Sequence, residues 1–398
     1  KKDVAASAPV DQRQRLISAG LQKFGYIFFF EDRREEMLLG ILHGMNAAEK
    51  ANDRPAIART SALTSVVMCV PKFHKWASFY ANRAVEMLDA DASLTDQAYV
   101  RLYNGLYHIG MGQWSDAESA FEDSIAAARE AGEKRVELDS VSFRRSMRLM
   151  RGRFHELPAL MEEHMEIAAA ANDMQHVYHT RTARGEMSLR HGDLEEADRW
   201  LTDARERLTE AYPSDHLLIL SPIAAIRMLQ GDVGEAWRLA SDQVRTVAKQ
   251  PPVGYYTVEA FWHLNGVYQN MIAKGVTPKG VSEAELAKMA KDALGASQAL
   301  AASFPSTAPR ARVLEARAER LQGRASAAEA KARAAADLAR AMETPMELAI
   351  AEAELGRNAG LGQSERSSRR AEAERIFAEI GLPEMAANVG LDVAPIHG

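Results

Sequence analysis

"MGQWSDAESAF", residues 111–121, is one of four related stretches that follow one another at nearly constant spacing. Each has a glycine, a variable residue, a mostly apolar residue and, three positions further on, usually an alanine or a leucine. The others are "RGRFHELPALM" (151–161), "HGDLEEADRWL" (191–201) and "QGDVGEAWRLA" (230–240). The four glycines stand at positions 112, 152, 192 and 231. Such a period, about 40 residues, predicts an array of similar structural units.

The same period extends in both directions along the chain. Single periods counted backwards from Gly112 reach Lys72 and then Asp32, two polar breaks between apolar helical patterns. Downstream, Gly323 and Gln363 are again one period apart, and the stretch between Gly231 and Gly323 accommodates two longer units. We therefore predict about nine units, with turns near residues 32, 72, 112, 152, 192, 231, 277, 323 and 363.

Each unit has the pattern of two helices joined by a turn. Val100, Tyr103 and Tyr107 recur at helical spacing before the turn, and Ala117 and Phe121 continue an apolar stripe after it. No alternating pattern bounded by hairpin turns indicates a strand. The sequence thus predicts an all-α fold, a superhelix of antiparallel helix pairs that forms one domain over residues 1–398, with 381–398 as a C-terminal tail.

"NGLYHIGMGQWSDAESAFEDSI" (104–125) resembles a tetratricopeptide repeat. It has a small residue, Gly105, and an aromatic, Tyr107, in the first helix, and an aromatic, Trp114, after the turn glycine. With its longer period, the chain resembles the C-terminal repeat region of large bacterial signal-transducing proteins, in which a nucleotide cyclase or a protein kinase precedes an ATPase module. "GMNAAEKANDRPAIART" (44–60) and the stretch 304–357 add to this likeness. The resemblance implies a cytoplasmic, non-enzymatic regulatory or scaffold domain that binds another protein or another domain of its own polypeptide.

The glycines Gly110 and Gly112 raise the alternative of a nucleotide-binding loop. A dinucleotide loop needs a preceding strand and a third glycine, whereas Ser115 occupies the place of that glycine here. The sequence also contains no G-x-x-x-x-G-K-[ST] loop. We therefore interpret Gly112 as the turn of a helix pair and predict no cofactor.

Composition narrows the possible functions further. The chain of 398 residues is 47% hydrophobic and 26% charged, with a net charge of −6, which does not favour a nucleic-acid-binding protein. One cysteine, Cys69, excludes an intrachain disulfide and favours the cytosol. The apolar runs are too short to span a bilayer. The chain begins on a lysine, and we interpret it as a fragment, a processed product or a trimmed protein.

Single residues offer little chemistry. His176 and His179 lie one helical turn apart and can share a metal, but no E-x-x-H or H-E-x-x-H motif supplies the usual carboxylate, so we favour an exposed or groove-lining polar face. Cys69 lies in an apolar run, which favours a buried small hydrophobe over a nucleophile. We predict no catalytic residue and no metal site.

Three stretches can be either core or interaction surface. For "FGYIFFFEDRR" (24–34) we favour burial over membrane contact, although in a fragment part of this face can meet a preceding domain. For the Arg- and Glu-rich stretch 310–341 we favour a solvated face with salt bridges. For the aromatic stretch 250–270 we favour core over recognition surface.

Stacked helix pairs curve into a superhelix whose concave face is formed by the first helix of each pair. Transfer of the repeat family's groove positions, counted from the turn glycine, gives a groove that is apolar at one end and polar at the other. The candidate groove residues are Tyr99, Leu102, Leu106, Asp139, Ser142, His179, Thr182 and Glu186. Such a groove suits a protein segment or a small organic effector better than a phosphate chain. The alternative is a sensor domain that closes on a small-molecule effector.

Overall fold

The computed structural model describes residues 11–31, 33–88, 92–208, 213–249 and 254–388. These residues form α-helices and three short 3-10 helices, with no strand among them. In chain order the elements are α1 (Gln12–Phe30), α2 (Arg34–Ala51), α3 (Arg54–Val67), α4 (His74–Met87), α5 (Leu94–Met111), α6 (Trp114–Ala131), α7 (Lys134–Met150), η1 (Phe154–Glu156), α8 (Leu157–Ala170), α9 (Met174–Arg190), α10 (Leu194–Arg205), α11 (Pro213–Leu229), α12 (Val233–Lys249), η2 (Tyr255–Thr257), α13 (Val258–Lys274), α14 (Glu283–Ser303), η3 (Pro305–Thr307), α15 (Ala308–Leu321), α16 (Ala325–Ala341), α17 (Pro345–Arg357), α18 (Gln363–Glu379) and α19 (Met385–Asn388).

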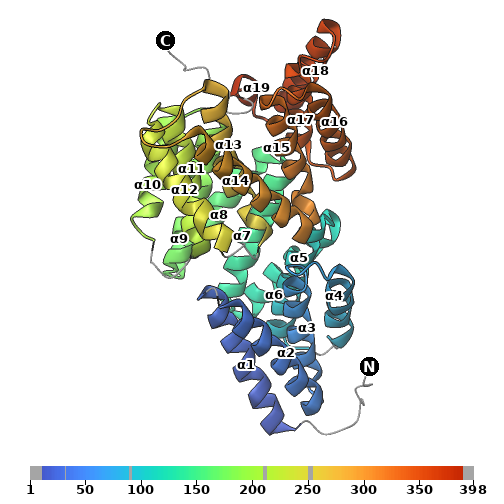
Figure 1. The fold of residues 1–398 in the computed structure, drawn as a ribbon. Helices are drawn as coiled ribbons and strands as arrows, with labels where there is room; N and C mark the ends of the chain where they lie inside the picture. The colour runs from blue at the N-terminus through green and yellow to red at the C-terminus, as the bar shows by residue number, and fades with distance from the viewer. Residues whose placement is uncertain (1–10, 32, 89–91, 209–212, 250–253, 389–398) are drawn as a thin grey trace. The chain divides into compact units, whose positions relative to one another are not determined.

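The predicted turns fall between the two helices of each pair, from α1 and α2 to α17 and α18, although Asp32 itself lies outside the described residues (Figure 1). Gly112 ends α5 in the left-handed conformation, with φ of +75°, which glycine adopts without strain. Its N–H donates to the Ile109 carbonyl at 2.9 Å and the Gln113 N–H donates to the His108 carbonyl at 2.8 Å, which satisfies the last carbonyls of the helix. The all-α array of helix pairs is confirmed, and Gly112 is a helix end rather than a phosphate loop.

The two helices of a pair approach closely where the first helix has a small residue. A Cβ atom added to Gly105 would lie 2.6 Å from Cε1 of Phe121, and one added to Gly185 would lie 2.6 Å from Cγ of Leu201. Gly25 meets Ile41 in the same way at 3.3 Å. In all three pairs the partner follows the glycine at the same spacing along the chain, so the sequence repeat is also a repeat of packing.

The described residues fall into two compact units, one ending at Arg144 and one beginning at Arg145 within α7. The first unit has a core rich in alanine, with Ala58, Ala62 and Ala84 fully buried beside Val100. One cluster of the second unit joins Phe154, Val313, Ile350 and Phe377 from four of its segments. Leu382 and Met385 belong to this cluster, so packing continues into the predicted tail, whose residues 389–398 lie outside the described part. The division into domains stays a prediction.

The aromatic stretch 250–270 is core, as predicted, for its described residues 254–270. Tyr255, Phe261, Trp262 and Tyr268 are at most 5% exposed. Cys69 is also buried, and burial raises the pKa of its thiol to about 12. No helix in the described ranges is both long and apolar enough to cross a membrane.

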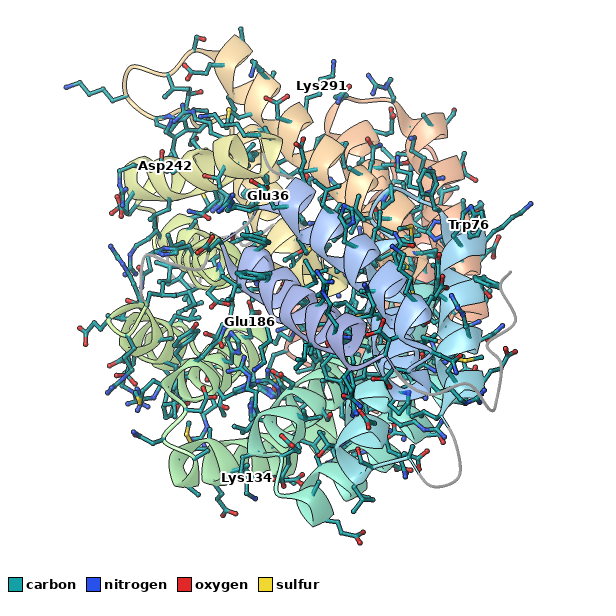
Figure 2. The ribbon with its side chains drawn as sticks, turned by 90° about the horizontal axis from the view of Figure 1, so that it is seen from below. Glu36, Trp76, Lys134, Glu186, Asp242 and Lys291 are labelled. Carbon is teal, nitrogen blue, oxygen red and sulfur yellow. The ribbon has the colours of Figure 1, made fainter. Side chains whose placement is uncertain are left out.

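Two other expectations are wrong in part. Phe24 and Ile27 of the stretch 24–34 are 54% and 46% exposed, because the described helices that contact α1, chiefly α2 and to a smaller extent α3, leave this face uncovered. In the stretch 310–341, Arg310 and Arg317 are 3% and 1% exposed, because carboxylates inside the second unit pair with them. Lys291 of α14, outside this stretch, is exposed (Figure 2).

Candidate functional site

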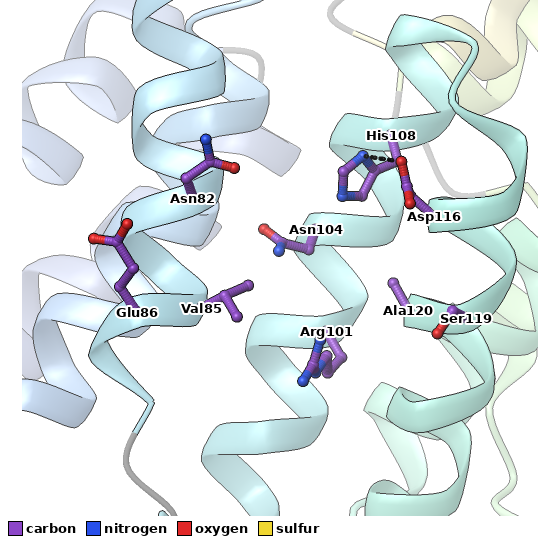
Figure 3. A pocket seen from close by; sticks show the side chains of 9 residues that line it. All are labelled: Asn82, Val85, Glu86, Arg101, Asn104, His108, Asp116, Ser119 and Ala120. Carbon is purple, nitrogen blue, oxygen red and sulfur yellow. Dashed lines mark ion pairs between the residues drawn. The ribbon is translucent and has the colours of Figure 1, made fainter.

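The first unit contains a groove of about 430 Å³ with α5 as its floor and α4 and α6 as its walls (Figure 3). Its wall residues are exposed except for Ala120, so the groove is an open trough rather than an enclosed cavity. The groove is lined by Asn82, Val85, Glu86, Arg101, Asn104, His108, Asp116, Ser119 and Ala120. An open trough of this kind suits an extended or helical segment of another protein better than a small molecule, which binds in pockets that bury most of its surface.

Asn104 lies at the floor of this groove, on α5, and its side chain points toward α4 (Figure 3). The residue is 4% exposed, yet its side-chain oxygen Oδ1 has no hydrogen-bond partner. A buried polar atom without a partner is unfavourable and uncommon in folded proteins. A donor on a bound segment would therefore be stabilised at this point.

The lining of the groove is more acidic than basic. Glu86 of α4 and Asp116 of α6 lie on the two walls, and Arg101 of α5 lies 3.7 Å from Asp123. His108 hydrogen-bonds Gln113 at 2.7 Å and lies 4.0 Å from Asp116. Because the charge of Arg101 is balanced by an acid outside the lining, the groove favours a segment with a lysine or an arginine.

The sequence-predicted groove residues of the first unit lie elsewhere. Tyr99 is half-buried and stacks on Tyr103 with 4.6 Å between ring centroids. Burial raises the pKa of Tyr99. The remaining members do not line the groove of Figure 3: Leu102 and Ser142 are buried and Leu106 is half-buried.

The predicted groove residues of the second unit make contacts inside that unit. His179 Nε2 lies 3.0 Å from Oδ1 of Asp215, and Thr182 donates to the carbonyl of Tyr178 at 2.9 Å. Glu186 is 7% exposed and lies among buried charges. Their role in binding a partner stays a prediction.

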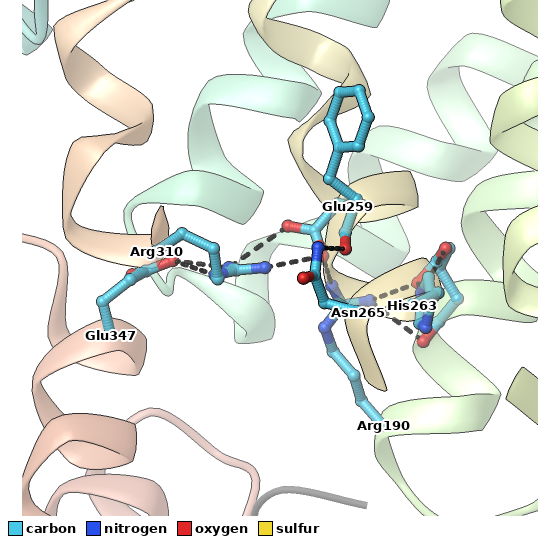
Figure 4. A network of polar contacts seen from close by, with 8 residues as sticks. Arg190, Glu259, His263, Asn265, Arg310 and Glu347 are labelled. Carbon is cyan, nitrogen blue, oxygen red and sulfur yellow. Dashed lines mark hydrogen bonds and ion pairs between the residues drawn. The ribbon is translucent and has the colours of Figure 1, made fainter. Parts of the chain in front are cut away.

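Glu186 belongs to a buried polar network that joins four helices of the second unit (Figure 4). His263 Nε2 of α13 lies 2.9 Å from Oε1 of Glu186, and Arg190 donates to Glu186 at 2.9 Å. Arg190 also donates to Glu259, which accepts from Arg310 at 3.1 Å. Arg310 then donates through Nε to Glu347 of α17 at 2.9 Å.

In this network the pKa of Glu259 is lowered, whereas the pKa of Glu347 is raised. Burial alone would raise the pKa of Glu259, but the guanidinium groups of Arg310 and Arg190 lower it to about 2. Burial raises the pKa of Glu347 above its usual range, and the negative charge of Glu259 raises it further. The guanidinium of Arg310 lowers this pKa, but not enough to reverse the shift. Because Oε2 of Glu347 has no hydrogen-bond partner, the ionised form of this carboxylate is incompletely stabilised.

Several polar contacts join the first helices of neighbouring helix pairs, and the two partners of each contact are separated by the same number of residues along the chain. The partners Arg59 and Asp96, Tyr178 and Asp215, Arg310 and Glu347, and Arg317 and Glu354 are each 37 residues apart. The spacing of 37 residues is shorter than the repeat period by about three residues, which is almost one helical turn. It therefore places an acid of the next first helix beside the donor on the preceding first helix. This spacing was a signal in the sequence that hydrophobic periodicity alone did not reveal.

The histidines predicted on an exposed face are not exposed together. His176 is 1% exposed and its Nδ1 lies 2.8 Å from Nε2 of His164, so this expectation is wrong for His176. Burial lowers the pKa of His164, with the charge of Arg145 adding to the effect. Within the described part of the chain, no group of three or more histidine, cysteine or acidic side chains is arranged to hold a metal ion.

A second, smaller groove of about 250 Å³ lies in the second unit. Arginines and leucines form most of its lining, with one acid. It is lined by Arg205, Leu208, His216, Leu220, Arg238, Leu239, Asp242 and Gln243. Among these described lining residues there is no buried unsatisfied polar atom, in contrast to Asn104 in the first groove.

No known family model matches the chain, and no curated protein matches its sequence. Among solved structures, the P58(IPK) TPR domain is similar at 12% sequence identity and a TM-score of 0.24, over 94% of this chain and 98% of that one. The fold assignment therefore rests on the helix pairs, turns and close contacts of the chain itself, which form an all-α helical repeat.

Proposed function

We propose that this chain is a non-enzymatic protein-binding scaffold that holds a segment of a partner protein in the groove between α4 and α6. The observation that carries the proposal is the buried, unsatisfied oxygen of Asn104 at the floor of an open trough. A peptide N–H or a side-chain donor of the partner would satisfy it, and the acidic edges formed by Glu86 and Asp116 favour a basic residue beside that donor.

The resemblance to bacterial signalling proteins suggests the setting of this activity. We place the chain as a regulatory repeat domain of a larger cytoplasmic signalling protein, in which the bound segment belongs to a partner or to another domain of the same polypeptide. Binding would act by population shift, since a ligand that prefers one arrangement of the helix pairs stabilises that arrangement.

The test is selection of peptides from a random displayed library against the full chain, followed by calorimetry with the selected peptides. We expect enrichment of sequences with lysine or arginine. Asn104→Ala should weaken binding about tenfold, since the hydrogen bond to a buried acceptor is lost, and Arg101→Glu should alter the charge preference. Asp242→Lys, in the second groove, is the matched control and should bind normally.

Circular dichroism melts of each variant separate loss of binding from loss of folding. Failure to enrich any peptide, or equal affinity of Asn104→Ala and the unaltered chain, would contradict the scaffold proposal at this groove. A metabolite that raises the melting temperature, with the effect lost in Asn104→Ala, would replace the scaffold by the small-molecule sensor.

A further inference from the structure

Helix α1 has an exposed apolar stripe. Ile17, Phe24 and Ile27 are 41%, 54% and 46% exposed, and Leu16 beside them is 73% exposed. A Cβ atom added to Gly20 would have no heavy atom within 4 Å, so the space above this glycine is open. A contiguous exposed apolar surface of this kind marks an interaction site in soluble proteins.

The repeat register shows what this surface is for. The positions one period after Ile17 and Phe24 are Ile57 and Thr64, which are 0% and 1% exposed in α3. The position two periods after Ile27 is Tyr107, which is 5% exposed in α5. Later first helices therefore cover most of the positions that α1 exposes, although Val67 and Gln97 in the same register are only half-buried. The stripe of α1 is the corresponding stacking surface, and the described residues of its unit leave it exposed.

The stripe on one copy of α1 is complementary to the stripe on a second copy that runs in the opposite direction. Successive residues of an α-helix are rotated by about 100°, so positions 13, 17, 20, 24, 27 and 31 point within about 40° of one direction. In an antiparallel pair of such helices centred between Gly20 and Phe24, Ile17 lies opposite Ile27 and Arg13 lies opposite Glu31. The bulky ring of Phe24 then lies opposite Gly20, which leaves room for it.

Charge agrees with the same register. Arg13 and Glu31 are both exposed, at opposite ends of the stripe. Glu31 lies 3.7 Å from Arg33 and has capacity for a second partner. In an antiparallel pair each Arg13 meets a Glu31, whereas a parallel pair would place like charges side by side.

We propose that two copies of this chain associate through antiparallel pairing of their α1 helices, with Phe24 of each copy over Gly20 of the other. The occupant of the stripe is thus a second copy of the chain. A symmetric contact of this type is closed, so it yields a dimer and no filament. The inference does not depend on the groove between α4 and α6.

Sedimentation equilibrium of the full chain from about 1 µM to about 1 mM tests the proposal. We expect a monomer–dimer equilibrium, and Phe24→Lys should weaken it about a hundredfold, because a charge replaces the central apolar side chain. Trp76→Lys is the matched control, since Trp76 is 58% exposed on α4 and lies outside the stripe (Figure 2). This variant should dimerise normally.

A charge exchange tests the register itself. Arg13→Glu and Glu31→Arg should each weaken the dimer, and the chain with both changes should regain most of the affinity, because every contact again joins opposite charges. Mixing Gly20→Cys with Phe24→Cys chains should give disulfide-linked dimers faster than either variant alone. A chain that stays monomeric at about 1 mM, or a double variant no better than the singles, would overturn the proposal.

Discussion

The two units join neighbouring first helices through the same 37-residue spacing but in different environments. In the first unit Arg59 donates to Asp96 with the two side chains 26% and 10% exposed. In the second unit Arg310 and Glu347 are 3% and 6% exposed, and Arg317 and Glu354 are 1% and 2% exposed. The same repeat spacing therefore accommodates either a water-accessible ion pair or a buried ion pair. The buried contact depends far more on every partner being present.

Removal of Arg310 should have the largest effect on this comparison. Arg310→Met leaves the carboxylates of Glu259 and Glu347 buried without their shared cation, and we expect a loss of about 3–5 kcal/mol in the free energy of unfolding at pH 7. Urea unfolding followed by circular dichroism measures it. The double variant Arg310→Met, Glu347→Leu should recover part of the loss, because one buried charge disappears with its partner. A single variant as stable as the unaltered chain would show that the network contributes nothing to the stability of the second unit.

In the first unit, packing rather than charge should dominate. Trp114 follows the turn glycine of α5 and α6 and is 6% exposed. Trp114→Ala should leave a void and cost about 3–5 kcal/mol, with the damage concentrated in neighbouring helix pairs, since each pair contacts only its neighbours. Hydrogen exchange read by mass spectrometry locates the damage. Loss of protection spread evenly over residues 214–388 would contradict this prediction.

Two variants should show opposite dependences on pH. The pKa of Glu259 is lowered to about 2, so its ionised form stabilises the fold above about pH 4.5, and this stabilisation, about 3 kcal/mol, is lost as the pH falls toward 2. The destabilisation caused by Glu259→Gln should therefore shrink with acidification. Thermal melts between about pH 3 and pH 8 measure the trend.

The carboxylate at the other end of the network should behave in the opposite sense. The pKa of Glu347 is raised in the folded chain, so its carboxyl keeps its proton to a higher pH there than in the unfolded chain. The fold therefore loses stability as the pH rises through the pKa of Glu347. Glu347→Gln does not titrate, so its stability relative to the unaltered chain should improve from about pH 4 to pH 7. The same sign of pH dependence in both variants would show that the two carboxylates share one environment.

The smallest expected effect on stability comes from adding a single methyl group at Gly105. Gly105→Ala places a Cβ 2.6 Å from Phe121 and should cost about 1–3 kcal/mol through overpacking. Gly295→Ala is the matched control in α14, where nothing lies within 4 Å of the added atom, and it should stabilise the second unit by about 0.5–1 kcal/mol. Melting temperatures that move in the same direction for both would mean that the close contact of α5 and α6 is absent.

Sequence periodicity predicted the helix pairs well because glycine is favoured where a helix ends in the left-handed conformation, although Lys72 has positive φ at one predicted turn. Gly112, Gly152, Gly192, Gly231 and Gly323 all have positive φ. The prediction failed at Phe24, because the pattern of an amphipathic helix is the same whether or not a neighbour covers it. A local pattern indicates which face can be buried, and only the arrangement of the pairs determines which face is.

The candidate site was much less predictable. Asn104 stands directly before Gly105, and the positions one period away, Thr64 and Arg144, are polar as well, so its residue type alone did not mark it as a groove residue. The predicted position Glu186 is part of a network whose other members extend as far along the chain as Glu347, several helix pairs later. Partners so distant in sequence cannot be paired by counting from one turn, since each helix length between them shifts the register.

The close contacts of Gly25, Gly105 and Gly185 occur in the first, third and fifth helix pairs, although a turn occurs in every pair. The alternating pairs have larger first-helix residues at this place, Ser65 and Arg145. A natural or engineered deletion of one pair would therefore bring two glycine-containing pairs together and lose a junction between unlike pairs. Removal of two consecutive pairs would join the same kinds of neighbour as before. Over the first five pairs, the module that evolution or a protein engineer can exchange without redesigning these junctions is thus the double pair.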